Sequence, residues 1–197
     1  MSAALRIHLV RHPQPAVATG ICYGQTDLGL AEPATAAAER LRSVLPTNAR
    51  VISSPLQRCL DLAEALATEV ETDRRLLEIN FGDWEGRSWD EIPRQQLDAW
   101  AAAPFEHVPP GGESAAAMAV RVIAFAADLV AAANTAATTD RADLERVLVA
   151  HQGPLRVLLA HWLDLPRESW LKLHLDFATA SCIELSPAGN RLLWLNR

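Results

Sequence analysis

Short apolar strands alternate with helices along this chain, and this alternation constrains the fold more than any other feature. Residues 5–10 and 146–150 are apolar stretches of strand length, and they stop at Arg11 and His151 respectively. Helical spacing of apolar residues follows each stretch. Strands that alternate with helices in this way are typical of α/β folds with a largely parallel sheet.

Further segments fill in the same pattern. We expect a short buried strand at residues 51–52 and helices over residues 32–45, 54–69, 114–133 and 153–162. Ser54 and Pro55 suit the N-cap and first position of the second helix. Residues 88–91 have the form of a capping box, and Pro93 limits the helix that follows. Residues 134–143 are small and polar, which predicts an exposed loop.

The C-terminal part predicts an antiparallel hairpin, with strands near residues 181–185 and 192–195 around a turn at 187–190. The expected architecture is therefore a three-layer α/β/α sandwich with a mostly parallel central sheet and an antiparallel edge near the C-terminus. The length of 197 residues favours a single domain over residues 1–197. Residues 79–113 are expected to form a helical, lid-like insert within it.

Composition narrows the possible partners. The net charge is −6 and no block of Lys or Arg occurs, so neither nucleic acid nor an anionic membrane is an expected partner. No signal peptide is seen, and no apolar run is expected to reach the roughly 20 residues of a membrane span. The three cysteines, Cys22, Cys59 and Cys182, are far apart, so neither zinc nor a disulfide framework is expected. Together these features favour the reducing cytoplasm.

Charged side chains follow the predicted strands at one edge of the sheet. Arg11 and His12 follow the first strand, Arg58 lies one turn into the helix after the second, and His151 follows a third. Open α/β sheets bind ligands at the carboxyl ends of their strands, and helix N-termini there attract anions. Taken singly, Arg58 could be a solvated helix residue and His151 a histidine with purely structural bonds. Taken together, they indicate a phosphate pocket.

These residues carry a resemblance to a known family. The segment 9–12 resembles the Arg-His motif of the histidine phosphatase superfamily, the phosphoglycerate mutase-like group. Residues 53–59, 77–86 and 149–153 resemble its later motifs, and residues 112–114 and 121–122 also match. The motifs keep the family's order and spacing over nearly the whole chain.

The resemblance implies a role for each matched residue. His12 would be the nucleophile that forms a phosphohistidine, and Glu78 the proton donor to the leaving oxygen. The phosphoryl oxygens would be held by Arg11, Arg58 and His151, and the planar fork of arginine suits the equatorial oxygens of phosphoryl transfer. No metal or other cofactor is implied.

Other positions near the motifs have weaker assignments. Gln25 and Gln152 are expected to contact the substrate. Glu85 is the second choice for the acid, with a structural or rim position as the simpler interpretation. Trp84 and Trp89 are expected to pack rather than stack on substrate.

Two departures from the family concern the loops that carry the histidines. Pro13 stands where the family usually has glycine, and it fixes its own φ and lacks an N–H donor. Gln14 and Pro15 also differ from the common residues, and Gln152 replaces the usual glycine after the second histidine. The charged residues of the pocket are all retained.

The implied function is hydrolysis of a small-molecule phosphate ester. Residues 20–28 resemble the corresponding loop of α-ribazole phosphatases of cobalamin biosynthesis, which favours α-ribazole 5′-phosphate. The main alternative is a broad-specificity sugar- or metabolite-phosphate phosphatase. A phosphoglycerate mutase is less favoured because residues 78–151 leave little material to cover a bisphosphate, and a non-catalytic binding protein is less favoured because the pocket is intact. The oligomeric state stays open, with a homodimer among the alternatives.

Overall fold

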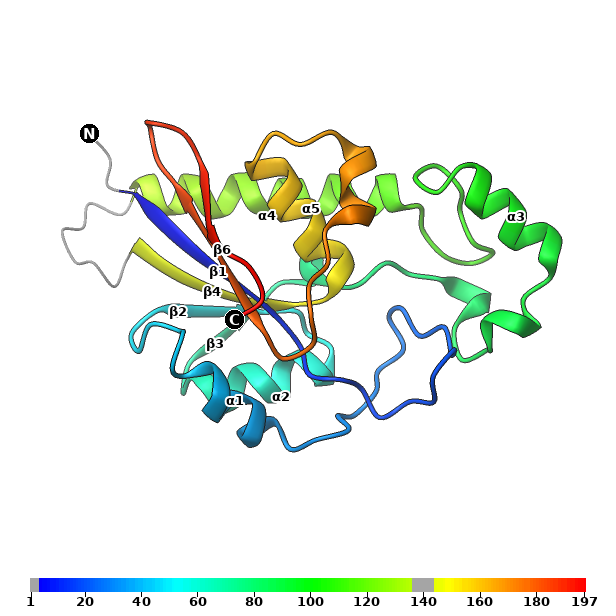
Figure 1. Cartoon of the computed structure of the whole chain (residues 1–197), viewed down its shortest axis with the longest axis horizontal. Coiled ribbons are helices and arrows are strands. Elements are labelled where there is room, and N and C mark those ends of the chain that lie inside the picture. Colours follow the sequence, from blue (N-terminus) through cyan, green and yellow to red (C-terminus); the bar gives the residue numbers. More distant parts are fainter. Residues whose placement is uncertain (1–3, 136–143) are drawn as a thin grey trace.

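The computed structural model describes residues 4–135 and 144–197, and its centre is a six-stranded sheet (Figure 1). The strands follow the order β3-β2-β4-β1-β5-β6. Their bounds are Leu5–Arg11 for β1, Arg50–Ser53 for β2, Val70–Thr72 for β3, Glu145–Ala150 for β4, Ala180–Leu185 for β5 and Arg191–Trp194 for β6. The pairs β1–β4, β2–β4 and β2–β3 are parallel, whereas β1–β5 and β5–β6 are antiparallel. The predicted sheet, with its antiparallel edge, is confirmed.

Helices cover both faces of the sheet. The helices α1 (Ala34–Leu41) and α2 (Gln57–Leu66) pack on one face, and α4 (Ala115–Thr135) and α5 (Gln152–Trp162) on the other (Figure 1). The period of two along β1 explains this arrangement, because alternate side chains of a strand point to opposite faces. Leu5, Ile7 and Leu9 join the core beneath α4 and α5, whereas Val10 joins the core beneath α1 and α2. The three-layer sandwich is therefore confirmed.

Several helix ends differ from the sequence-based expectation. The first helix stops at Leu41 rather than residue 45, and its end tightens into turns before Pro46, which disfavours helical backbone in the residue before it. The second begins at Gln57, not at residues 54–55. The Ser54 hydroxyl contacts His151 instead, and the Gln57 N–H donates to the Asp27 carboxylate at 2.7 Å.

The same helix also ends early, at Leu66, and the chain then forms β3, a strand that the sequence did not predict. The capping box at residues 88–91 is present, but it caps a three-residue 3₁₀ turn. The predicted loop at residues 134–143 begins inside α4, which continues to Thr135, and residues 136–143 lie outside the described part of the chain.

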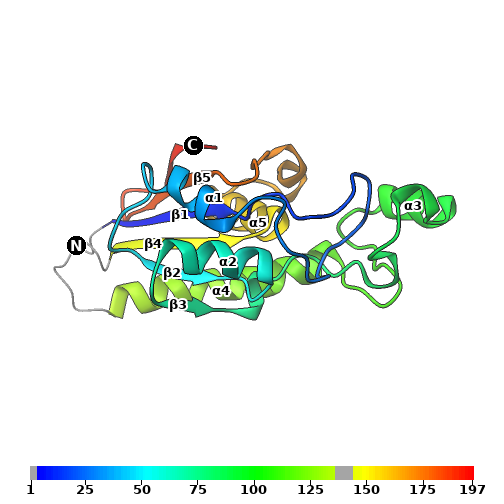
Figure 2. The same ribbon diagram turned by 90° about the horizontal axis from the view of Figure 1, so that it is seen from below.

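The segment between Glu78 and α4 extends beyond the end of the sheet (Figures 1 and 2). It contains α3 (Arg94–Ala102) and, together with Cys22 from the loop after β1, forms a small core that we call the aromatic cluster. The cluster consists of Cys22, Phe81, Trp84, Trp89, Ile92, Leu97 and Trp100. Rings of Trp89 and Trp100 stack at 5.7 Å between centroids, and Trp84 is buried as expected. A lid-like motion of residues 79–113 stays a prediction.

Helix α4 corrects one expectation from composition. Its 21 residues are long and apolar enough, by those two criteria, to cross a membrane. In the fold it is a core helix, because Met118, Val122, Phe125 and Leu129 on its buried face pack against the sheet and α5. The sequence-based statement that no apolar run approaches that length is therefore wrong. The burial of α4 in the core explains why its sequence is so apolar.

Candidate active site

The carboxyl ends of β1, β2 and β4 bring the two histidines together at one edge of the sheet. In the parallel register Arg11 lies beside Ala150, so His12 and His151 leave adjacent strands at the same level. The His12 N–H donates to the Ala150 carbonyl at 3.1 Å, and the two imidazole rings are 5.0 Å apart between centroids. Strand register, rather than loop geometry, thus sets the distance between them.

The backbone beside His12 fixes the state of its ring. Nδ1 lies 2.6 Å from the Pro13 carbonyl oxygen. Since a carbonyl oxygen only accepts, Nδ1 carries the proton and Nε2 keeps its lone pair. Nε2 has no hydrogen-bond partner among the described residues. Proline at this position removes an N–H but retains the carbonyl that His12 uses, so the departure from glycine leaves this contact intact.

The surroundings of His12 keep the ring neutral. Burial, followed by the Arg58 and Arg11 charges, lowers the pKa of His12 to about 3. A neutral imidazole has the lone pair that nucleophilic attack requires. The ring also contacts Phe177, with 5.5 Å between centroids.

Arg58 and His151 lie behind His12 and bond to each other. Arg58 is fully buried, and its Nε donates to His151 Nδ1 at 3.2 Å. The terminal nitrogens of Arg58 donate to the carbonyls of Thr26 at 2.8 Å and Gly24 at 2.6 Å. A guanidinium has five N–H groups, so two remain for a phosphoryl oxygen.

His151 is engaged at both ring nitrogens. Because Nδ1 accepts from Arg58, Nε2 carries the proton and donates to the Ser54 hydroxyl at 2.8 Å. Burial, followed by the charges of His12 and the arginines, lowers its pKa well below the usual value. The predicted contact of His151 with a phosphoryl oxygen therefore requires Nε2 to leave Ser54.

Arg11 is positioned by Leu175 and Phe177. One terminal nitrogen donates to the Leu175 carbonyl at 2.5 Å, and the guanidinium carbon lies 3.5 Å from the centroid of the Phe177 ring. Burial lowers the pKa of Arg11, and the neighbouring Tyr23 and Glu78 partly oppose that effect. These contacts hold the planar guanidinium in one orientation, which favours two-point binding of an oxyanion.

Glu78 is placed by main-chain donors around its carboxylate. The Gly153 N–H, in the first turn of α5, donates to Oε2 at 3.2 Å, and the Ile79 N–H donates to Oε1 at 2.9 Å. Its own carbonyl accepts from Arg121 at 3.0 Å and from Gln25 at 2.9 Å. Arg121 in turn pairs with Glu113 at 2.5 Å. Motif residues far apart in the sequence thus hold the backbone of Glu78.

Glu85, the second choice for the acid, is held by loop residues. Its carboxylate accepts from the N–H groups of Gln25, Thr26 and Phe81 at 2.9, 2.5 and 2.9 Å, and from the Thr26 hydroxyl at 2.5 Å. Three of the four donors belong to a loop distant in the sequence, and Glu85 is not among the residues lining the cavity. The Glu85 carboxylate therefore fixes the loop whose carbonyls bind Arg58. This agrees with the structural position that the sequence favoured for Glu85.

The two glutamines differ in position. Gln152 lines the cavity, and its amide lies 3.5 Å from the Leu175 carbonyl. Gln25 is not among the residues that line the cavity, and its amide nitrogen donates to the Glu78 carbonyl. Gln25 thus supports the backbone of Glu78, and its predicted contact with the substrate stays a prediction.

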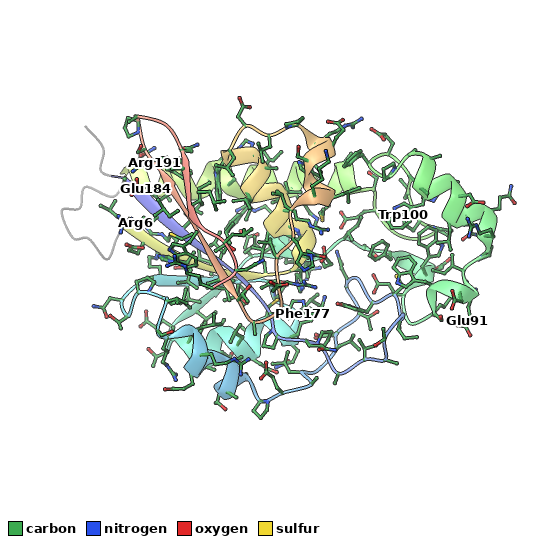
Figure 3. All side chains as sticks on the ribbon, in the orientation of Figure 1. Arg6, Glu91, Trp100, Phe177, Glu184 and Arg191 are labelled. Carbon is green, nitrogen blue, oxygen red and sulfur yellow. The ribbon has the colours of Figure 1, made fainter. Side chains whose placement is uncertain are left out.

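A cavity of about 530 Å³ opens over these groups. Arg11, His12 and Glu78 line one end, whereas Arg58 and His151 lie behind it. The remaining wall is largely apolar and includes Ile21, Phe81, Trp89, Trp100, Phe105, Trp170 and Leu171. Trp89 therefore both packs in the insert and faces the cavity, which the sequence did not predict. Figure 3 shows Trp100 in the insert and Phe177 near the end of the sheet.

Two polar cavity residues were not singled out from the sequence. Tyr23 lines the cavity beside Arg11, and its ring centroid lies 5.4 Å from the Arg58 guanidinium carbon. Arg156 lines it from α5. Arg156 follows Gln152 by four residues, which places both on one side of the helix. That spacing is the signal that could have identified it.

The described residues include three thiols but no candidate metal site. Within residues 4–135 and 144–197, no group of three or more His, Cys, Asp or Glu side chains is arranged to hold a metal ion. Cys22, Cys59 and Cys182 are free and buried, and burial raises the pKa of each thiol. Cys59 packs against the His151 ring, with its Sγ 3.5 Å from Nε2.

The chain matches a known family model over almost its whole length. The model of the histidine phosphatase superfamily (branch 1) matches residues 7–197. Among curated proteins, the glucosyl-3-phosphoglycerate phosphatase of Mycobacterium tuberculosis is 36% identical over 196 residues, which cover 93% of this chain and 86% of the relative.

Two further similarities concern α-ribazole phosphatases. The adenosylcobalamin/α-ribazole phosphatase of Salmonella typhimurium is 28% identical over 203 residues, covering 98% of this chain and 96% of the relative. The crystal structure of the α-ribazole phosphatase from Shigella flexneri superposes with a TM-score of 0.85 at 25% identity, covering 98% of this chain and 96% of that one.

Proposed function

This chain belongs to the histidine phosphatase superfamily (branch 1), and on that premise we propose that it is a metal-independent phosphomonoesterase with His12 as its nucleophile. One observation carries the proposal. His12 is buried and neutral, and its Nδ1 proton is held by the Pro13 carbonyl, so Nε2 is left with its lone pair at the wall of the cavity. The phosphatase names of its relatives support the reaction class.

The first step transfers the phosphoryl group to the protein. Nε2 of His12 attacks phosphorus, the bond from phosphorus to the ester oxygen breaks, and Glu78 gives its proton to that oxygen. Arg11 and Arg58 bind the equatorial oxygens, where charge is concentrated. His151 adds a neutral N–H donor once Nε2 exchanges Ser54 for a phosphoryl oxygen.

The second step restores the protein. Glu78, now ionised, takes a proton from water, and the water oxygen attacks the phosphorus of the phosphohistidine. The bond from phosphorus to Nε2 breaks, inorganic phosphate forms, and His12 becomes neutral again. The Gly153 N–H holds the Glu78 carboxylate for both proton transfers.

The names of the relatives point to different substrates. Their names support two candidates, α-ribazole 5′-phosphate and glucosyl-3-phosphoglycerate, and the largely apolar, aromatic wall of the cavity suits either a base or a sugar ring. A broad-specificity metabolite phosphatase is the third. A mutase is less favoured, because it must keep water from the phosphohistidine.

The test uses p-nitrophenyl phosphate with EDTA present. We expect turnover to persist in the chelator and to be abolished in His12→Ala. Incubation with ³²P-labelled ester followed by an alkaline quench should retain label on wild type and lose it in His12→Ala. Loss of turnover in EDTA, or a His12→Ala rate above a few per cent of wild type, would refute the proposal.

A further inference from the structure

Arg156 lines the cavity, but no step of the reaction above uses it. It lies in the second turn of α5, three residues after Gly153 and four after Gln152, so all three share the helix side that faces the cavity. Its Nε donates to the Leu173 carbonyl at 2.5 Å, which fixes the plane of the guanidinium. Within the described ranges the structure records no ion pair between Arg156 and a carboxylate.

The position of Arg156 makes it a recognition group. Aromatic and aliphatic side chains form most of the wall around it, with Phe105 and Trp170 among them. Placing a cation in such surroundings is costly unless an anion accompanies it. Burial lowers the pKa of Arg156 and Glu78 opposes that effect, which agrees with a half-buried cation on the Glu78 side of the cavity. This is the side where the leaving oxygen is protonated.

We propose that Arg156 binds a carboxylate carried by the leaving group, so that the preferred substrates are phosphate monoesters of hydroxy acids. The proposal rests on the proposed phosphatase function. The planar fork of a guanidinium pairs with both oxygens of a carboxylate. A second phosphate suits the site less well, because the single positive charge of Arg156 balances a carboxylate but not a dianion. The proposal also separates the two substrate candidates, since glucosyl-3-phosphoglycerate carries a carboxylate and α-ribazole 5′-phosphate does not.

The test compares two esters that differ only in the group Arg156 would bind. 3-Phosphoglycerate has a carboxylate where glycerol 3-phosphate has a hydroxymethyl group. We expect wild type to prefer 3-phosphoglycerate by about tenfold or more in kcat/KM, as befits a hydrogen-bonded ion pair. Arg156→Met should remove that preference mainly through KM, and should change kcat/KM for glycerol 3-phosphate by less than about threefold. Arg156→Lys should recover part of it.

Control measurements separate this inference from the proposed function. Arg74→Met removes an exposed arginine away from the cavity and should leave both esters unaffected. Calorimetric binding of 3-phosphoglycerate to His12→Ala requires no turnover, and we expect it to weaken about tenfold or more when Arg156→Met is added. Equal binding by the single and double variants would overturn the inference even if the chain proved not to hydrolyse p-nitrophenyl phosphate.

Three kinetic results would overturn it while leaving the phosphatase function intact. These are a wild-type preference near one, an equal fall for both esters in Arg156→Met, and a preference for propane-1,3-diol bisphosphate over 3-phosphoglycerate. The last result would show that Arg156 binds a second phosphate rather than a carboxylate.

Discussion

Replacing Gly153 with alanine should displace the catalytic acid while leaving the fold intact. An ideal Cβ on Gly153 would lie 2.2 Å from Glu78 Oε1 and 3.1 Å from the Met118 sulfur. The carboxylate must therefore move by about 1 Å to reach an ordinary contact distance, and such a displacement can cost about 100-fold in rate. The Gly153 N–H bond to Oε2 weakens at the same time.

The expected loss depends on the leaving group. Alkyl phosphates need their leaving oxygen protonated, so we expect kcat/KM for glycerol 3-phosphate, which reports the first phosphoryl transfer, to fall about 100-fold in Gly153→Ala. p-Nitrophenolate leaves without a proton, so kcat/KM for p-nitrophenyl phosphate should fall by less than about tenfold. The comparison uses kcat/KM because kcat also contains the second step, in which Glu78 is the base for both esters. Stability should stay within about 1 kcal/mol of wild type, because alanine is favourable in a helix and the contacted atoms belong to movable side chains.

The assay is a pair of steady-state measurements on the two esters, with urea denaturation alongside. Gly29→Ala is the matched control, since its Cβ would have no atom within 4 Å and its φ is not positive. Equal losses of kcat/KM on both esters, or full activity on the alkyl ester, would refute the reasoning that Glu78 donates the proton from its present position.

Three further perturbations test other parts of the site. Because the pKa of His12 is about 3 when folded and 6.5 when unfolded, the unfolded chain binds a proton more readily between these values. The free energy of unfolding should fall as pH drops from about 6.5 towards 3, and His12→Gln should reduce that slope in urea titrations; an unchanged slope would contradict the assignment. Glu85→Ala should cost about 2 kcal/mol or more by leaving loop N–H groups unpaired, and should raise KM by loosening Arg58; a loss confined to kcat on alkyl esters, at unchanged stability, would return the acid role to Glu85. Arg121→Met frees the carbonyls of Arg75, Leu77 and Glu78 and should destabilise by about 2 kcal/mol or more in urea, and wild-type stability would show that these contacts are dispensable.

Sequence reasoning was strongest where one local pattern decides the structure. The alternation along β1 and the apolar run of β4 determine which side chains face each helix layer, and their last residues place His12 and His151 at one edge. It was weaker for β3, a three-residue edge strand whose Glu71 and Thr72 are exposed and which lacks an apolar signal.

The remaining differences arise from contacts between distant residues. Ser54 has the local chemistry of an N-cap, but its hydroxyl bonds to His151, and Asp27 caps the helix from another loop. Gln25 looks like a substrate contact in its motif, yet its amide is taken by the Glu78 carbonyl. The two members of each pair lie far apart in the sequence. A local pattern therefore cannot show that Ser54 bonds to His151 rather than caps a helix, or that the Gln25 amide bonds to Glu78. The roles of the site residues themselves stay predictions until the variants are measured.

The aromatic cluster ties the shape of the cavity to the integrity of the insert. Trp89 and Trp100 line the cavity and are also packed in the insert's own core. Shortening either residue to admit a bulkier ester would remove support for the wall that it was meant to reshape. Ile21, Ala101 and Leu171 line the same space without belonging to the cluster. Changes in substrate size, whether by natural drift or by design, should therefore accumulate at these positions while the tryptophans stay fixed.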